Sequence, residues 1–221
     1  MSSGDWQYSF PQVFNLTSGD DFFVASEVAP TAKSVIVNAG AGDDVVIGTL
    51  GNDFIFGGDG NDQLIGDAGN DFISGGAGDD MIAGNSGTDI LSGGAGSDTF
   101  QYAFSLSQGS SGGDSHDGDH HYYYSRDDSG IRLSSADGND VITDFQFGTD
   151  VLQFTDANFS GLSLTEQQFE DLFQLRQLDT NNDGVKDTTV LSLDDGGWSV
   201  TLIGVAGHTE ADFYHEAVQF A

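Results

Sequence analysis

Seven aspartates recur at every ninth residue between Ala39 and Gln101, and a glycine stands two positions before each of them. The aspartates, in the sixth position of each nine-residue unit, are Asp44, Asp53, Asp62, Asp71, Asp80, Asp89 and Asp98. The fourth-position glycines are Gly42, Gly51, Gly60, Gly69, Gly78, Gly87 and Gly96. Ca²⁺ takes six to eight oxygen ligands from carboxylates and backbone carbonyls. Glycine can adopt positive φ and turn carbonyls towards an ion without a Cβ clash. The pattern therefore predicts calcium sites built from the repeat itself.

A second regularity describes the scaffold that must hold these residues. An aliphatic residue or phenylalanine occupies the eighth position of every unit, so each unit offers one side chain to a core. A short fixed period indicates a stacked solenoid, in which two units form one coil and an ion lies between turns two units apart. Seven turns then give about five shared sites, to which the second-position glycines Gly40, Gly58 and Gly76 also belong. An acidic glycine-rich linker is disfavoured, because linkers do not place an apolar residue at every ninth position.

The units resemble the RTX family, whose G-G-x-G-x-D-x-U-x repeat forms a calcium-bound parallel β-roll. The resemblance implies an all-β fold, a right-handed parallel β-roll over residues 39–101. The segment from Gly138 onward (GNDVITDFQFGTDVLQF) is similar to the C-terminal region of serralysin-type and other type I-secreted proteins. That likeness implies a small β-rich cap and an uncleaved secretion signal. The chain departs from it by continuing beyond Asp212 and Phe213, where such proteins often end.

The remaining segments flank or interrupt the roll. Residues 1–38 form a lead-in with a degenerate repeat at Leu16–Val24 and a strand at Ser34–Asn38. Residues 102–134 form a polar insertion, and residues 135–221 form the C-terminal part, where Asp140 and Asp150 keep the sixth-position phase. In that part, Thr165 and Gln168 form a capping box before an amphipathic helix expected over residues 166–177. Thr188–Leu193 and Trp198–Val205 follow and predict a hairpin with a turn at Asp194–Gly197.

A further acidic loop, D-x-N-x-D-G-x-x-D, precedes this hairpin and matches the first nine positions of an EF-hand loop. Its expected oxygen ligands are Asp179, Asn181, Asp183, the Val185 carbonyl and Asp187. The twelfth position holds Val190 in place of a bidentate glutamate, so the site would be weaker or need another donor. An Asn/Asp/Gly turn without an ion is the alternative.

Composition limits the partners. The chain has 36 acidic and 5 basic residues, a net charge of −31, which argues against nucleic acid because binding there depends on cationic contacts to phosphate. No stretch approaches the ~18 apolar residues of a membrane span, so no membrane insertion is expected. Self-repulsion opposes folding, and about five to eight Ca²⁺ ions would cancel roughly a third to a half of the charge.

We therefore expect a chain that is largely disordered without calcium and folds outside the cell. Calcium modules of the extracellular kind have Kd values of about 10⁻⁴–10⁻³ M and stay empty inside cells. The N-terminus shows no Sec-type signal and the chain has no cysteine, so type I secretion to the extracellular space or cell surface is the expected route.

No catalytic pattern is convincing. Gly109–Gly113 matches G-x-S-x-G but has no strand before it and no helix after it, and His215-Glu216 lacks a second histidine at Gln219. The insertion holds Asp114, His116, Asp117, Asp119, His120 and His121, followed by Tyr122–Tyr124. These residues either bind a transition metal or form a solvated loop, and the tyrosines either form a contact surface or pack on the roll.

One outward stripe indicates a function. Phe54, Phe72 and Ile90 hold the seventh position of alternate units, and side chains next to an inward eighth residue must face outward. Either the 166–177 helix or the N-terminal segment covers them, or another copy or partner does. The favoured function is a non-enzymatic structural or adhesive component of a bacterial surface layer, matrix or filament. The alternatives are a stand-alone folding and secretion module, and a calcium-dependent binder of carbohydrate or protein.

Overall fold

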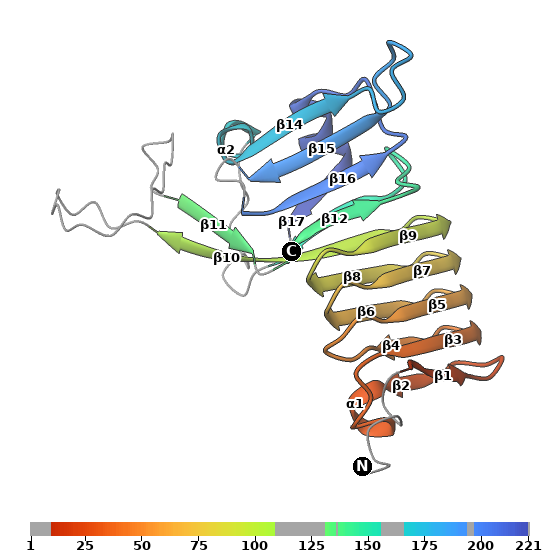
Figure 1. Cartoon of the computed structure of the whole chain (residues 1–221). Helices are drawn as coiled ribbons and strands as arrows, with labels where there is room; N and C mark the ends of the chain where they lie inside the picture. The colour runs from red at the N-terminus through yellow and green to blue at the C-terminus, as the bar shows by residue number, and fades with distance from the viewer. Residues whose placement is uncertain (1–9, 109–130, 136, 156–165, 194–196, 221) are drawn as a thin grey trace, which may run out of the picture.

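The structure is a computed structural model that describes residues 10–108, 131–135, 137–155, 166–193 and 197–220. Its strands stack in two sheets that rise from the N-terminal end to a C-terminal cap (Figure 1). One sheet has nine strands in the order β1-β3-β5-β7-β9-β12-β16-β15-β14, and the other has eight in the order β17-β13-β10-β8-β6-β4-β2. Successive repeats thus alternate between the sheets, and neighbouring strands of the roll are parallel. This confirms the parallel β-roll.

The roll strands of the nine-stranded sheet are β1 (Gln12–Asn15), β3 (Val35–Ala41), β5 (Phe54–Asp59), β7 (Phe72–Ala77), β9 (Ile90–Ala95) and β12 (Asn139–Ile142). Those of the eight-stranded sheet are β2 (Phe22–Val24), β4 (Val45–Ile47), β6 (Gln63–Ala68), β8 (Met81–Ser86), β10 (Thr99–Gln108), β13 (Val151–Thr155) and β17 (Val218–Phe220). Most are longer than one unit's apolar triplet, because a strand such as β5 continues into the first three positions of the next unit.

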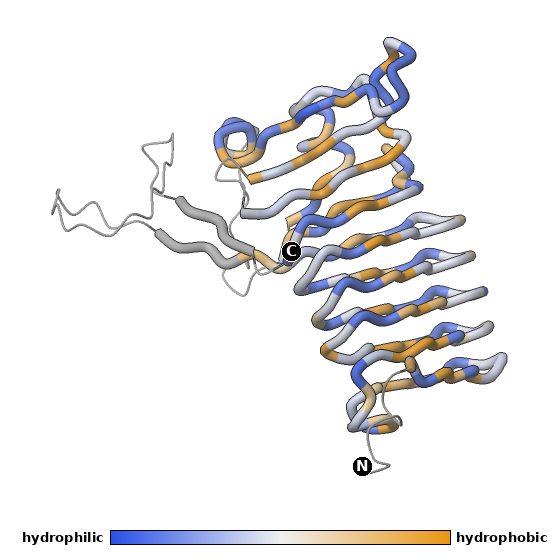
Figure 2. Tube along the Cα trace, viewed as in Figure 1, coloured by the Kyte–Doolittle hydropathy of each residue, from blue (hydrophilic) through white to orange (hydrophobic). Residues whose placement is uncertain are grey.

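The eighth-position side chains form the core between the sheets. Val46, Leu64, Ile82 and Phe100 line one sheet and Ile55, Ile73 and Leu91 line the other, all buried. Because alternate residues of a strand face opposite sides, the seventh and ninth positions point outward. Hydrophobic segments consequently recur at the same place on successive strands (Figure 2).

The turns depend on backbone conformations that favour glycine. Gly58 has φ +122°, and a Cβ there would collide with the backbone carbonyl of Gly40 on the preceding coil. The corresponding second positions on the opposite edge hold Asp67 and Asn85, also at positive φ. Asparagine and aspartate are the side chains that best tolerate this region, so the coil spacing is maintained on both edges.

The degenerate repeats extend the roll at both ends. β2 pairs in parallel with β4, and Asp21 lies next to Asp44 in the same phase. A short helix, α1 (Ala25–Val28), then leads to β3, which overlaps the strand predicted at Ser34–Asn38. Beyond the roll repeats, β12 pairs with β9 and β13 pairs with β10.

The cap closes the top of both sheets. The predicted hairpin is present, with β15 (Thr188–Leu193) antiparallel to β16 (Ser199–Ile203), and β16 joins β12 in the nine-stranded sheet. Trp198 lies at the centre of an aromatic cluster, with ring centroids 5.0 Å from Tyr102 and 5.2 Å from Phe104. The tail adds α3 (Glu210–Asp212), a π-helical turn (Phe213–Ala217) and β17 (Val218–Phe220), which forms an edge strand of the eight-stranded sheet.

The expected helix over residues 166–177 is wrong in its length. Helix α2 covers Glu166–Leu172, and Phe173–Leu178 forms strand β14, antiparallel to β15. Phe173 and Leu175 fit helical spacing, but they also alternate with polar residues, and pairing with β15 selects the strand. No helix among the described residues has the length and apolar character needed to cross a bilayer.

The roll also continues into the segment expected to be a polar insertion. β10 runs to Gln108 and pairs with β11 (Ile131–Ser135) in an antiparallel hairpin that projects from the roll (Figure 1). Tyr102 and Phe104 are buried because they cover the core below the cap. The His/Asp cluster, Tyr122–Tyr124, the G-x-S-x-G match, Thr165 of the capping box and residues 194–196 of the hairpin turn lie outside the described residues.

Candidate metal centre

The sixth-position aspartates form two ladders, one along each edge of the roll. Every one of them is at most 3% exposed. One carboxylate oxygen of each accepts a backbone N–H from the preceding coil, as in the 2.8 Å bond from Asp62 N to Asp80 Oδ1. The donor is an aspartate in every case but Asp53, which accepts from Val35 N. One ladder contains Asp21, Asp44, Asp62, Asp80, Asp98 and Asp150, and the other contains Asp53, Asp71, Asp89 and Asp140.

The second oxygen of most ladder carboxylates has no protein partner. Among the described residues, Oδ2 is buried and accepts no hydrogen bond in Asp44, Asp62, Asp71, Asp80, Asp89, Asp98 and Asp140. A buried anionic oxygen without a partner is costly, because it has lost its hydration with nothing in exchange. Seven such oxygens in the two ladders indicate binding sites for a cation.

The first-position glycines provide the space for that ligand. A Cβ built on Gly57 would contact Asp62 Oδ2 and lie 2.6 Å from the carbonyl oxygen of Gly75. Gly75 repeats the arrangement with Asp80 Oδ2 and the Gly93 carbonyl oxygen, again at 2.6 Å. The turns of Gly57, Gly66 and Gly75 therefore each leave a cradle between a carboxylate oxygen and a carbonyl oxygen of the next coil.

These donors fit calcium. In the part of the chain that the structure describes, no three His, Asp or Glu side chains converge into a metal-binding group. An ion here would depend on backbone carbonyls for much of its coordination, and Ca²⁺ accepts such mixed oxygen shells. The predicted glycine ligands agree with this role: Gly40, Gly42, Gly58, Gly60, Gly69, Gly76 and Gly78 have positive φ, and Gly51 does not.

Burial also changes the acidity of the ladders. Desolvation raises the pKa of Asp71, Asp80 and Asp140 to about 7 and that of Asp89 and Asp98 to about 6. The backbone N–H that each accepts offsets part of the rise, and neighbouring aspartates add to it. Burial raises the pKa of Asp44, Asp53, Asp62 and Asp150 as well. A bound cation would favour the ionised form of these carboxyls.

Two predicted ligands differ from the others. Both oxygens of Asp53 accept protein hydrogen bonds, from Val35 N at 2.7 Å and from Thr49 N at 2.5 Å. Both oxygens of Asp150 do so too, from Asp98 N at 3.1 Å and from Gln146 N at 2.7 Å. Neither carboxylate offers the free oxygen that the other ladder aspartates have.

A second, outer ladder, which was not predicted from the sequence, runs beside the aspartate ladders. The fifth-position Asn and Asp side chains accept the backbone N–H one coil later, as Asp43 Oδ1 does from Asn61 N at 2.8 Å. On the other edge Asn52 Oδ1 accepts from Asn70 N at 2.9 Å. The preference for Asn or Asp before the sixth position was the available signal. These bonds hold the turns at the coil spacing.

Asp144 is a further acidic residue that the sequence analysis left without a role. Its carboxylate accepts N–H bonds from Gly93 at 3.1 Å and Gly94 at 2.9 Å and a hydroxyl bond from Ser92 at 2.7 Å. It therefore closes the last regular turn on the side of the cap.

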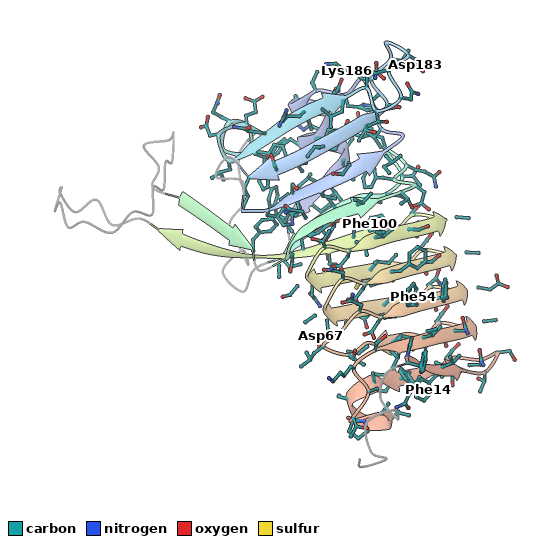
Figure 3. All side chains as sticks on the ribbon, viewed as in Figure 1. Phe14, Phe54, Asp67, Phe100, Asp183 and Lys186 are labelled. Atoms are coloured by element: carbon teal, nitrogen blue, oxygen red, sulfur yellow. The ribbon has the colours of Figure 1, made fainter. Side chains whose placement is uncertain are left out.

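The EF-like loop curls as its sequence predicts. Asp179 Oδ2 accepts the N–H of Gly184 at 2.8 Å, and Asp179 Oδ1 is buried without a hydrogen-bond partner among the described residues. Asn181 Oδ1 accepts from Asp183 N at 3.0 Å, and Asp183 Oδ1 from Val185 N at 2.8 Å. The loop lies at the outer tip of the β14–β15 hairpin, where Figure 3 shows Asp183 and Lys186.

Asp187 has a more constrained position in this loop. Its Oδ1 accepts the N–H and hydroxyl of Thr180 at 3.1 and 2.8 Å, and these bonds hold its pKa below the usual range. The twelfth position, Val190, lies inside β15, so the loop runs into a strand. Among the described residues, the loop thus has one buried carboxylate oxygen without a hydrogen-bond partner, against seven in the roll, and calcium binding there stays a prediction.

The fold and the ladders together define a parallel β-roll with a calcium-type donor set in its turns. In agreement, the family description "RTX calcium-binding nonapeptide repeat (4 copies)" matches residues 38–73 and 65–100. This part of the chain is a calcium-binding RTX β-roll.

Solved structures include similar chains. The extracellular lipase LipA of Serratia marcescens aligns over 97% of this chain and 40% of its own, with 16% identity and a TM-score of 0.38. Two subunits of the Azotobacter vinelandii mannuronan C5-epimerase also align. AlgE6R3 aligns over 86% of this chain and 74% of its own, with 25% identity and a TM-score of 0.26. AlgE6R2 aligns over 96% of this chain and 92% of its own, with 19% identity and a TM-score of 0.30. The chain thus spans 40% of the length of the lipase, and no protein of curated function matches it in sequence.

Proposed function

We propose that this calcium-binding roll is secreted, folds on extracellular Ca²⁺ and acts as a non-enzymatic structural or adhesive component of a bacterial surface layer, matrix or filament. The observation that carries the proposal is a continuous row of apolar side chains on the outer face of the nine-stranded sheet. We call this row the apolar ridge. It consists of Val13, Ile36, Phe54, Phe72, Ile90 and Val141.

The ridge follows the strand register across six neighbouring strands. Phe54 lies opposite Phe72, and Phe72 lies opposite Ile90, with the Phe54 and Phe72 ring centroids 6.2 Å apart. Phe54 and Ile90 are each 45% exposed (Figure 3 shows Phe54). With strands spaced about 4.8 Å apart, the ridge is roughly 24 Å long. An apolar row of this length on a soluble surface favours a contact with another molecule.

No described segment covers the ridge. The expectation that the helix predicted over residues 166–177 covers it is therefore wrong for α2. This helix packs beside β14 and α3 in the cap. The described N-terminal strand β1 extends the sheet at its edge and contributes Val13 to the ridge. The ridge is therefore open to a partner along the described roll.

The residues that flank the ridge in the fifth- and ninth-position rows are uncharged, although the chain carries a net charge of −31. The fifth-position residues of the same edge are Asn52, Asn70, Thr88 and Asn139. The ninth-position row holds Asn38, Phe56, Ser74, Ser92 and Thr143. Like-charge repulsion is consequently smaller here than elsewhere on the surface.

A second copy of the chain is the occupant that this surface fits best. Another roll presents rungs at the same spacing, so its ridge side chains can lie between those of the first over the full length. Self-complementary patches are the usual basis of symmetric assembly. Calcium would promote this contact in two ways: it folds the roll, and it removes two negative charges per ion.

The experiment compares Phe72→Ser with the matched control Phe22→Ser. Phe22 is 72% exposed and lies on β2 in the opposite sheet, so both changes remove an outward phenylalanine. Light scattering and electron microscopy, with and without millimolar Ca²⁺, report assembly, and a calcium titration followed by circular dichroism reports folding. We expect wild type and Phe22→Ser to form large assemblies in Ca²⁺, and Phe72→Ser to fold at a nearly unchanged midpoint without assembling.

The other functions give different results. A stand-alone folding and secretion module would be monomeric in all three proteins. If the ridge were covered within the chain, Phe72→Ser would lose the ~3–5 kcal/mol of a buried aromatic truncation. A calcium-dependent binder would stay small until a carbohydrate or protein ligand is added. Assembly of Phe72→Ser at the wild-type level would refute the interface.

A further inference from the structure

The second turn of the roll differs from the others at its second position. That position holds Thr49, whereas the next turns hold Gly58 and Asp67 at positive φ. Among the described residues, those other than glycine with positive φ are Asp67, Asn85 and Asn182, so Thr49 does not adopt this conformation. A β-branched residue there would be strained. The backbone of this turn therefore takes another path.

The changed path directs protein donors at the ladder carboxylate. Thr49 N donates to Asp53 Oδ2 at 2.5 Å, and Thr49 Oγ1 lies 3.0 Å from Asp53 Oδ1. The threonine hydroxyl is also within 3.2 Å of the Lys33 carbonyl oxygen, in the loop before β3. Asp53 is thus held by its own turn and by the N-terminal segment.

The same four-residue spacing recurs at two other aspartates. Thr17 donates to Asp21 Oδ2 through its backbone N and through Oγ1, both at 2.7 Å. Gln146 N donates to Asp150 Oδ2 at 2.7 Å. In all three turns, the residue four positions before the aspartate replaces the second-position Gly, Asp or Asn of a regular turn.

These three aspartates lie at three of the four ladder ends; Asp140, at the fourth end, keeps an Oδ2 without a hydrogen-bond partner. Asp21 begins one ladder and Asp150 ends it, and Asp53 begins the other. Before Asp53, the coil position belongs to Val35, which follows a loop without a repeat. An end turn has a neighbouring repeat turn on one side alone, whereas the calcium cradle uses oxygens from two coils. Solenoids need ends that are satisfied without a further repeat.

We infer that Thr49, Thr17 and Gln146 close the calcium ladders, so that Asp21, Asp53 and Asp150 bind no calcium. The ions are then confined to the turns of the seven aspartates with an unpartnered Oδ2. An N–H pointing at a carboxylate oxygen takes one of its two lone pairs and places a partial positive charge beside it, which disfavours a cation there. This inference rests on the calcium binding of the roll, and it makes Thr49 the residue that decides the state of the second turn.

Thr49 is the best position for a test, because the rest of its cradle is intact. A Cβ built on Gly48 would lie 2.5 Å from Asp53 Oδ2 and 2.6 Å from the Gly66 carbonyl oxygen, much as in the regular turns. Thr49→Gly would allow positive φ and withdraw both threonine donors. We expect this variant to gain one calcium ion.

The experiment counts the ions bound at saturating Ca²⁺ by native mass spectrometry on the full chain. Asp53→Asn and Asp71→Asn are compared at equivalent positions of neighbouring coils, and Thr88→Gly serves as the control for Thr49→Gly in a regular turn. We expect Asp53→Asn and Thr88→Gly to keep the wild-type count, Asp71→Asn to lose at least one ion, and Thr49→Gly to gain one.

Loss of ions from Asp53→Asn to the extent seen in Asp71→Asn would overturn the inference. An unchanged count in Thr49→Gly would overturn it as well, and this arm decides the matter if Asp53→Asn does not fold. A wild-type chain that binds no calcium would refute calcium binding by the roll. That result differs from one in which the wild type binds calcium but the variants do not change the number of bound ions as expected, which would refute the closure of the ladders alone.

Discussion

Acidification should fold the calcium-free chain, because protons can neutralise the same buried carboxylates that calcium would bind. The perturbation is a change from pH 8 to pH 5 in calcium-depleted buffer. In the folded roll, Asp71, Asp80 and Asp140 have pKa values of about 7, raised by burial from 3.8. In the unfolded chain the same carboxyls are solvated and titrate near the ordinary value.

The magnitude follows from these values. One pKa unit corresponds to about 1.4 kcal/mol, so keeping Asp71 ionised in the ion-free roll at pH 8 costs roughly 4 kcal/mol relative to the unfolded chain. With Asp89 and Asp98 at about 6, the five carboxyls together cost on the order of 20 kcal/mol. A domain's whole stability is typically about 5–15 kcal/mol. The ion-free roll should therefore be unfolded at pH 8.

The sign of the effect is fixed by which state binds more protons. Between pH 4 and pH 7 the folded state holds protons that the unfolded state has released, so stability falls as pH rises through this window. The stabilisation is fully present near pH 4 and is lost as pH passes the folded pKa values of about 6 to 7. Protons and calcium compete for the same oxygens, so acid should also raise the calcium midpoint.

Far-UV circular dichroism of the calcium-free protein at pH 5 and pH 8 measures the effect, with light scattering to exclude aggregation. Asp71→Asn/Asp80→Asn/Asp140→Asn places neutral isosteres in the ladders and should gain β-structure at pH 8 without calcium.

The control variant changes the exposed Asp43, Asp59 and Asp79 to Asn and removes the same net charge. Equal β-content at both pH values would refute the burial argument. An equal gain in the control would show that general charge repulsion, and not the ladders, opposes folding.

Three further results are expected. Asp71→Ala should raise the calcium midpoint by at least about tenfold, ~1.4 kcal/mol. The effect should exceed that of Asp187→Ala, because Asp71 also accepts the Asp53 N–H. The reverse order would make the EF-like loop the main site. Gly75→Ala should lower the number of bound calcium ions, because its Cβ would enter the cradle at Asp80. The control Gly19→Ala should not, because a Cβ on Gly19 would have no atom within 4 Å. Equal effects of the two changes would refute the cradle. Mg²⁺ should not replace Ca²⁺ in driving folding, because it demands tighter octahedral geometry, and a similar circular dichroism midpoint for both ions would contradict the carbonyl-rich site.

The roll could be predicted in detail because its period is both local and repeated. One buried residue and one aspartate in every nine leave a single register in which the coils can stack. The same phase located the degenerate turns, since Asp21, Asp140 and Asp150 take their predicted places in the ladders. Short-range pattern and long-range pairing agree here, so little depended on tertiary context.

The state of the individual carboxylates could not be predicted from the same pattern. Gly51 and Asp53 satisfy the fourth- and sixth-position rule, yet Asp53 is hydrogen-bonded on both oxygens. The difference arises from the φ value at the second position, where Thr49 replaces glycine. The motif specifies which residues form the ladder, and the residue at the second position decides whether the carboxylate keeps an oxygen without a hydrogen-bond partner.

The error in the cap has another cause. Phe169, Leu172, Phe173 and Leu175 fit a helical face, and the helix does begin as predicted. From Phe173 onward the sequence is compatible with both a helix and a strand. The antiparallel pairing of β14 with β15 settles the choice through pairing with residues ten or more positions away. A local window contains no information about that partner.

The ridge and the second ladder are built from adjacent residues, which connects the two proposals. Phe54, Phe72, Ile90 and Val141 each directly follow a ladder aspartate: Asp53, Asp71, Asp89 and Asp140. A ligand that ties the aspartates of successive coils together therefore also fixes the spacing of the outward side chains beside them. With Asp53 closed by Thr49, the first of these four rungs is held by protein hydrogen bonds, and the next three have the unpartnered carboxylate oxygens through which calcium would hold them. The surface proposed for self-association is thus set by the same turns that bind the ion.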